Sequence, residues 1–175
     1  MMNYPEHLIA SLQLPDGTAV TIRPARPEDV DLIKNFFRQL SPQRKHALFM
    51  ENFRELPQDM LTRLAAVDYN HDMVLLAMQL KNGKESLIAL SRYVTTAFPD
   101  ECEFSVVVSD EWQNSGIDSH IMNALINAAK QQKLKTMTGM FLASNIEIMR
   151  LVEHLGFAVK DSDDPTVKHA TKSLS

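Results

Sequence analysis

The stretch from residue 102 to residue 142 leaves few folds open to this chain. Residues 102–108 (CEFSVVV) alternate as a β-strand does, residues 116–132 carry apolar side chains at helical spacing, and residues 136–142 (TMTGMFL) again favour a strand. A connection of this length with a helix inside it allows a right-handed crossover between two parallel strands. The chain is therefore predicted to form a mixed α/β fold whose sheet contains a parallel pair.

Further strand-like and helix-like segments lie on both sides of this stretch. Asn82-Gly83 is a strong hairpin signal between apolar segments at residues 73–78 and 86–93. The other expected strands are residues 18–22, 157–159 and 166–171, and the last is polar enough to be an edge strand. Helical segments are expected from Pro27, from Ser41-Pro42 to about Met50, from Pro57, and at residues 145–155. We expect a central mixed sheet of about seven strands with about four helices.

Composition places the chain among ordinary globular domains. We interpret residues 1–175 as a single domain, with residues 1–13 as an N-terminal extension, because no linker or repeat interrupts the pattern. The net charge of −4 disfavours a nucleic-acid binder. No apolar run is long enough for a membrane span, and no signal peptide is visible, so we expect no membrane partner and a cytoplasmic location.

The turn between the strand at 102–108 and the following helix, SDEWQNSGIDS, is a candidate anion site. A strand that leads directly into a helix leaves several backbone N–H groups unpaired at the helix N-terminus. Taken alone, the turn is interpreted as an ordinary strand-to-helix connection, because most such turns bind no ligand. The glycine content of the whole chain is low: five of its 175 residues are glycine, which is less than half of the usual fraction of about 7%.

Several segments in the right order give this turn a family context. The chain resembles the GNAT superfamily of N-acetyltransferases, and within it the acetyltransferase domain of bacterial Pat-type protein lysine acetyltransferases. The resemblance runs from about Leu14 to Phe157 and rests on LPDGTAVTIRPARPED, FFRQLSP, LAAVDYNHDM, EFSVVVSDEWQ, Asn145 and Gly156-Phe157. It implies the GNAT acyl-CoA N-acyltransferase fold, with acetyl-coenzyme A as the co-substrate.

By position, the resemblance also implies a set of cofactor-binding residues. These comprise backbone groups for the pantetheine arm, a pyrophosphate turn, and an asparagine that opens the helix beside the cofactor. The backbone groups for the pantetheine arm are those of Val106, Val107 and Val108. The pyrophosphate turn consists of Gln113, Asn114, Ser115, Gly116, Ile117, Asp118 and Ser119, and the asparagine is Asn145. The ordinary interpretation of Val106 and Val108 is as strand core and of Asn145 as a helix cap, and both interpretations can hold together.

The turn departs from the family pattern Q/R-x-x-G-x-G/A. Gln113 and Gly116 fit, but Asp118 stands where glycine or alanine is usual, and Asn114-Ser115 stands where glycine followed by a basic residue is usual. A carboxylate near a phosphate opposes its binding, whereas the helix dipole favours Asp118 in the free protein. We therefore expect Asp118 to stabilise the helix and to weaken coenzyme A binding.

Glu103 is the candidate catalytic residue. Its position, ten residues before Gln113, matches the catalytic glutamate of the Pat-type enzymes, which implies a general base that removes a proton from the attacking amine. Without the resemblance, Glu103 is a solvent-facing strand carboxylate. Some GNAT enzymes use a tyrosine as the general acid; Val152 stands at that position here.

Two function hypotheses follow. In the first, the chain acetylates a primary amine, for which the resemblance suggests a protein lysine. In the second, it is a degenerate GNAT module that binds coenzyme A weakly or not at all and acts through protein contacts. The six histidines and Cys102 show no metal-ligand spacing, so we expect no metal, and Cys102 is interpreted as a buried hydrophobe. The sequence indicates no oligomeric state.

Overall fold

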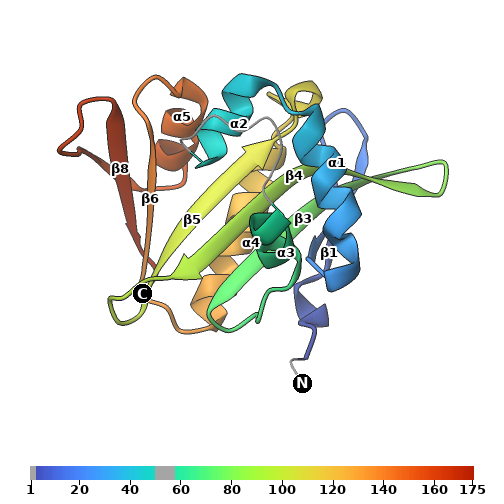
Figure 1. Ribbon diagram of the computed structural model, residues 1–175, viewed down its shortest axis with the longest axis horizontal. Coiled ribbons are helices and arrows are strands. Elements are labelled where there is room, and N and C mark those ends of the chain that lie inside the picture. The colour runs from blue at the N-terminus through green and yellow to red at the C-terminus, as the bar shows by residue number, and fades with distance from the viewer. Residues whose placement is uncertain (1–2, 50–57) are drawn as a thin grey trace.

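One mixed sheet runs through the part of the chain that the computed structural model describes, residues 3–49 and 58–175 (Figure 1). Its eight strands are β1 (Ala10–Gln13), β2 (Ala19–Pro24), β3 (Asp72–Lys81), β4 (Lys84–Thr95), β5 (Glu101–Val108), β6 (Thr136–Leu142), β7 (Ala158–Asp161) and β8 (Val167–Ser173). Their order across the sheet is β1-β2-β3-β4-β5-β6-β8-β7. All neighbours are antiparallel except β5 and β6, which are parallel, so the predicted crossover is confirmed.

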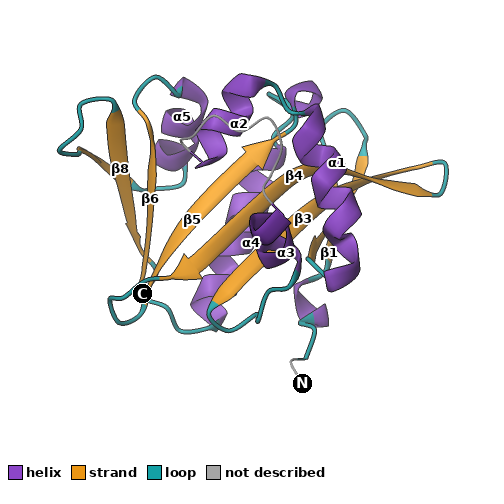
Figure 2. Cartoon of the chain, in the orientation of Figure 1, coloured by secondary structure: helices purple, strands orange, loops and turns teal. Residues whose placement is uncertain are grey.

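Helices cover both faces of this sheet (Figure 2). Within the described residues they are α1 (Val30–Gln39), α2 (Pro42–Phe49), α3 (Gln58–Ala65), α4 (Ile117–Gln131) and α5 (Ile146–His154), with short 3-10 turns at Glu6–Leu8, Pro27–Asp29 and Asp110–Trp112. In Figure 1, α1 and α3 lie in front of the sheet and α4 lies behind it. The Ser91 hydroxyl donates to the Ile121 carbonyl, which identifies the face of β4 that α4 covers. Within the described residues, no helix is both long and apolar enough to cross a membrane.

The predicted hairpin lies between β3 and β4. Asn82 and Gly83 both have positive φ, at 52° and 76°. A two-residue turn of this kind matches the twist of the flanking strands, and it requires residues that tolerate the left-handed region. The local signal therefore set the register from Lys81–Lys84 at the turn to Met78–Leu87, beyond which an irregularity between Ala77 and Met78 shifts the pairing by one residue up to Asp72–Val94.

Three expectations from the sequence need correction. Residues 10–13, assigned to an extension, form the additional strand β1 beside β2, which a four-residue, largely exposed strand barely signals in sequence. The last strand, β8, is not an edge: it lies between β6 and β7, and β7 forms the edge. Polar residues in β8 are explained by its partly open faces, not by an open side. The described part of the chain also has five α-helices where about four were expected. The expected end of one helix at about Met50 and the expected start of the next helix at Pro57 lie outside the described residues.

A close contact joins the bases of β5 and β6. A Cβ added to Gly139 in β6 would lie 2.2 Å from Cε1 of Phe104 in β5, so only glycine fits there without displacing the ring. The Phe104 ring also packs against Phe157, with centroids 5.2 Å apart. The contact between Phe104 and Gly139 packs β5 against β6 just beyond their last paired residues. The contact with Phe157 joins β5 to the segment between α5 and β7.

A buried ion pair anchors the start of α1. Arg23 donates to both carboxylate oxygens of Asp29 at 2.7 and 2.8 Å, and Asp29 also accepts the backbone N–H of Arg26. Both charged side chains are less than a tenth exposed. Burial raises the pKa of Asp29, but the hydrogen bonds from Arg23 and Arg26 outweigh it and hold the pKa below its ordinary value.

Candidate functional site

The candidate site begins where β5 and β6 separate. The two strands pair at only three positions, from Glu101–Thr136 to Glu103–Thr138, while β5 continues to Val108 with β4 alone as its partner. The β5 edge that faces β6 is therefore unpaired by any strand after Glu103. A cavity of about 810 Å³ lies against this edge. Strand splaying has thus placed backbone hydrogen-bonding groups on the wall of a groove.

The groove brings together several residues that the sequence singled out. Its wall includes Val106, Val107, Val108, Gln113, Asp118 and Asn145, together with Leu142, Ile146, Ile148 and Leu151 from the β6 side. A smaller cavity of about 230 Å³ adjoins the same turn and includes Asn114 and Ser119. Ser115, Gly116 and Ile117 line neither cavity, and Ile117 is fully buried in the core. The ligand roles of all these residues stay predictions.

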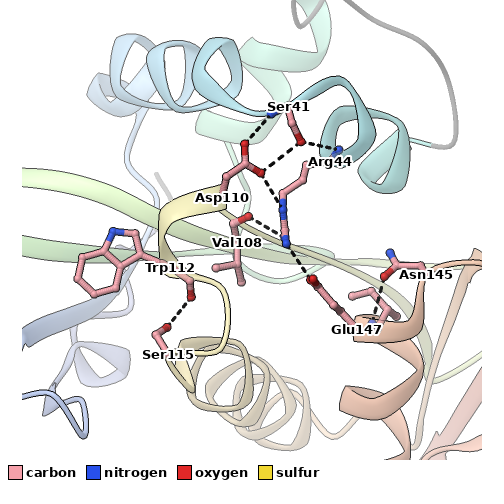
Figure 3. A network of polar contacts seen from close by, with 9 residues as sticks. Ser41, Arg44, Val108, Asp110, Trp112, Ser115, Asn145 and Glu147 are labelled. Atoms are coloured by element: carbon pink, nitrogen blue, oxygen red, sulfur yellow. Dashed lines mark hydrogen bonds and ion pairs between the residues drawn. The ribbon is translucent and has the colours of Figure 1, made fainter.

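The turn before α4 is held by its own hydrogen bonds. Ser115 donates to the Trp112 carbonyl at 2.6 Å (Figure 3). It also accepts the Ile117 N–H at 3.3 Å. Asn114 and Gly116 have positive φ, at 60° and 87°. Asparagine is one of the few residues that tolerate this conformation, so Asn114 keeps the backbone shape that a glycine would allow. The Trp112 ring packs against the core beneath the turn.

Asp118 lies in the first turn of α4 and borders both cavities. One of its carboxylate oxygens accepts the Ser119 N–H at 2.8 Å. The Ile117 N–H is already bonded to Ser115, so two of the amides at this helix start have partners inside the protein. The negative charge of Asp118 therefore stands at the place where the sequence predicted the pyrophosphate.

A guanidinium that the sequence did not single out lies across the groove. Arg44 of α2 donates to the Val108 carbonyl at 3.0 Å, and it forms ion pairs with Asp110 at 2.9 Å and Glu147 of α5 at 2.8 Å (Figure 3). Its side chain is only 15% exposed. Asp110 also accepts the backbone N–H and the hydroxyl of Ser41, which caps the start of α2. The guanidinium of Arg44 thus links α2 to the turn through Asp110 and to α5 through Glu147.

A second basic group borders the smaller cavity. Arg150 and His154 lie on the same side of α5 as Glu147, at spacings of three and four residues, and both line that cavity. Arg44 and Arg150 therefore supply positive charge near a turn that lacks the usual basic residue. Helical spacing could have indicated Arg150, but no local signal pointed to Arg44.

Asn145 caps α5. Its side-chain oxygen accepts the Ile148 N–H at 3.2 Å, as expected of a residue at a helix start. The same residue borders the groove, so the cap and the predicted cofactor contact are compatible.

Glu103 stands at the last paired position of β5 and β6, where the strands begin to separate. It is exposed and does not line either cavity. Its neighbours in register are Val94 on β4 and Thr138 on β6. The Glu103 carboxylate therefore lies at the end of the groove where β5 and β6 are still paired, on the face of the sheet opposite α4.

Cys102, next to Glu103, points to the other face. It is fully buried, and burial raises the pKa of its thiol to about 12. A thiol of this kind is protonated at neutral pH and is a poor nucleophile. Among the described residues, no three His, Cys, Asp or Glu side chains gather as a metal site.

Comparisons with known proteins identify the family and the fold. The family model described as "Acetyltransferase (GNAT) domain" matches residues 19–158. Acetyltransferase PA5475 of Pseudomonas aeruginosa is 32% identical over 92% of this chain and 86% of its own length. The GNAT domain of S. lividans PAT superposes with a TM-score of 0.89 at 23% identity and covers 98% of this chain and 99% of that one. YncA of Salmonella typhimurium, solved with its cofactor acetyl-CoA, has a TM-score of 0.72 at 19% identity and covers 89% of this chain and 94% of its own.

Proposed function

The chain belongs to the GNAT acetyltransferase family, and we propose that it transfers an acetyl group from acetyl-coenzyme A to a primary amine, with a protein lysine as the acceptor. The observation that carries this proposal is the separation of β5 from β6 after Glu103, beside a groove of about 810 Å³. The unpaired strand edge suits the amides of pantetheine, and the start of α4 suits the pyrophosphate. Acetyl-CoA bound to YncA, which shares the fold, supports this assignment. We place the protein in the cytoplasm, which its single buried cysteine supports.

Residues of this chain can hold the co-substrate despite the altered turn. The backbone of Val106–Val108 would bind the pantetheine arm, with Gln113 and the turn at the pyrophosphate. Arg44 and Arg150 would offset the negative charges of Asp118 and of the phosphates. For Arg44, the phosphate oxygens would compete with Asp110 and Glu147, the carboxylates that it binds in this structure.

Glu103 is proposed as the general base. The acceptor amine must lose a proton before its nitrogen can attack the thioester carbonyl carbon, and Glu103 accepts that proton directly or through a water molecule. The new C–N bond forms as the C–S bond breaks, and the coenzyme A thiolate leaves. Val152, at the position of the tyrosine acid in some GNAT enzymes, has no proton to donate, so the thiolate leaves unaided or takes a proton from water.

One set of observations favours the second function, a module that acts through protein contacts. Asp110, Asp118 and Glu147 place three carboxylates around the groove, and Arg44 already occupies the Val108 carbonyl. This arrangement would oppose coenzyme A if Arg44 stays bound to its carboxylates.

Thermal or calorimetric titration with acetyl-coenzyme A separates the two functions. A ligand at one hundred times its dissociation constant adds about 2.7 kcal/mol to the free energy of unfolding. We expect a rise in Tm that saturates with acetyl-coenzyme A, and no comparable rise with acetate and adenosine added as separate compounds. An unchanged Tm at millimolar acetyl-coenzyme A would exclude the enzyme and favour the module.

Asp118→Asn is expected to tighten coenzyme A binding about tenfold. A carboxylate about 5 Å from a phosphate costs about 3 kcal/mol at an effective dielectric of 20, and salt lowers that cost toward the 1.4 kcal/mol that equals a factor of ten. Isothermal titration at low and high salt measures the change, which should shrink at high salt. Glu111→Gln is the matched control, because Glu111 lies in the same turn but lines neither cavity. Equal affinity in wild type and Asp118→Asn would mean that the Asp118 charge does not face the phosphates.

A further inference from the structure

Arg92 lies on β4 beside the candidate base. In register it is opposite Val74 on β3 and Ser105 on β5, and the next row on the same face holds Asp72, Val94 and Glu103. Arg92 and Glu103 are therefore diagonal neighbours, and residues in that relation are roughly 7–8 Å apart, within reach of a long side chain. Ser91, which precedes Arg92 in the strand, points to α4, so Arg92 points to the opposite face.

The Arg92 guanidinium lacks the carboxylate partners that Arg23 and Arg44 have. Its Nε is buried and has no hydrogen-bond partner, and Arg92 forms no ion pair with a described residue. The Nε of Arg23 is also buried without a hydrogen-bond partner, but the other two nitrogens of that guanidinium bind Asp29, and the guanidinium of Arg44 binds Asp110 and Glu147. Burial lowers the pKa of Arg92, whereas the nearby charges of Asp72 and Glu103 oppose that shift. A buried donor without an acceptor is costly and indicates a partner that is supplied from outside.

The chemistry of the missing partner follows from the guanidinium. Its planar fork of N–H donors matches a carboxylate, which it binds through two parallel hydrogen bonds. Among the described residues, the carboxylates of Asp72 and Glu103 lie near Arg92 without forming an ion pair with it, so its guanidinium is available to a carboxylate of the acceptor molecule. The amine of that acceptor must reach Glu103, one diagonal away on the same face.

We propose that Arg92 binds an anionic group of the acceptor, so that the enzyme selects lysines with an acidic neighbour. The amine of the acceptor in this inference rests on the proposed function. The anionic group of the acceptor rests on the guanidinium of Arg92, which forms no ion pair with a described residue. Arg92 is here a specificity residue, and Glu103 remains the residue that touches the reacting nitrogen.

Two lysine peptides that differ only in the residues beside the lysine test the proposal: one carries Glu on both sides, the other Gln. For the wild type we expect kcat/KM to be about tenfold or more higher with the Glu peptide, as loss of a charge-assisted hydrogen bond would predict. Arg92→Gln should bring this ratio close to one, and Arg92→Lys should restore only part of it, because lysine keeps the charge but loses the fork. Arg63→Gln is the control: Arg63 lies near Arg92 but its side chain is 63% exposed.

Binding is followed separately by the 15N–1H resonance of the Arg92 Nε, assigned by its absence in Arg92→Lys. A shift of this resonance with the Glu peptide only, together with faster acetylation, supports both proposals. A shift without any acetylation supports the anion site and overturns lysine acetylation. Equal acetylation of both peptides without a shift overturns the role of Arg92 and leaves the proposed function standing. Neither acetylation nor a shift overturns both.

Discussion

Replacing Glu103 with glutamine is expected to lower kcat about a hundredfold or more, the usual contribution of a general base. Glutamine keeps the size of the side chain but cannot take the proton from the attacking amine. The dissociation constant of acetyl-coenzyme A should stay unchanged, because Glu103 does not line the groove. A steady-state assay of free thiol release, paired with calorimetry, measures both quantities.

Glu101→Gln is the matched control for this prediction. Glu101 lies on the same strand and face, two residues away, but its carboxylate accepts a hydrogen bond from Thr96 at 2.7 Å. We expect this variant to keep a kcat close to that of the wild type. If Glu101→Gln loses activity and Glu103→Gln retains it, the base has been assigned to the wrong carboxylate. If both stay active, the proton goes to another group or to water.

Asp29→Asn is expected to lower the free energy of unfolding by about 3–5 kcal/mol, because removing one partner of a buried ion pair leaves the other charge uncompensated. The charge that loses its buried partner would be Arg23, whose side chain is 8% exposed and whose remaining ion pair is a 3.7 Å contact with the half-exposed Glu85. Urea unfolding measured by circular dichroism gives the change. Adding Arg23→Met to Asp29→Asn should recover much of the loss, because the buried charge is then removed as well.

The pH dependence of the same pair has a definite sign. The pKa of Asp29 is lower in the folded protein than its ordinary value of about 3.9, so its contribution is complete above that pH and is lost as the pH falls through the folded value. The difference between wild type and Asp29→Asn should therefore be constant near neutral pH and shrink in acid. Asp59→Asn is a surface control, since the exposed Asp59–Arg63 pair contributes at most about 0.5 kcal/mol. A loss at Asp29 no larger than at Asp59 would contradict the prediction.

Much of the fold was predictable because the signals are local. Asn82-Gly83 identified a hairpin, since few residues adopt two successive positive φ values. The helical spacing from residue 117 and the apolar strands on either side of it identified the parallel crossover. Strand β1 was missed because four largely exposed residues carry little periodicity, and the place of β8 was missed because polarity does not distinguish an edge from a partly open interior strand.

The candidate site was only partly predictable. Val106–Val108, Gln113, Asp118 and Asn145 were expected from their place along the chain, and they do lie around one groove. Arg44 was not expected, since its partners Val108 and Glu147 are 64 and 103 residues away in sequence. Nor does any motif mark Arg92, which looks like an ordinary polar residue within a strand.

By itself, the sequence of this protein determined the order and kind of its elements, the turn that opens α4, and the carboxylate on β5, because backbone preference and side-chain period act within a few residues. Only the tertiary structure decided where β5 leaves β6, that Arg44 of α2 reaches the resulting groove, and that Arg92 forms no ion pair with a described residue. Those outcomes depend on how distant strands and helices pack, since a charge gains or lacks a partner only when separate elements meet.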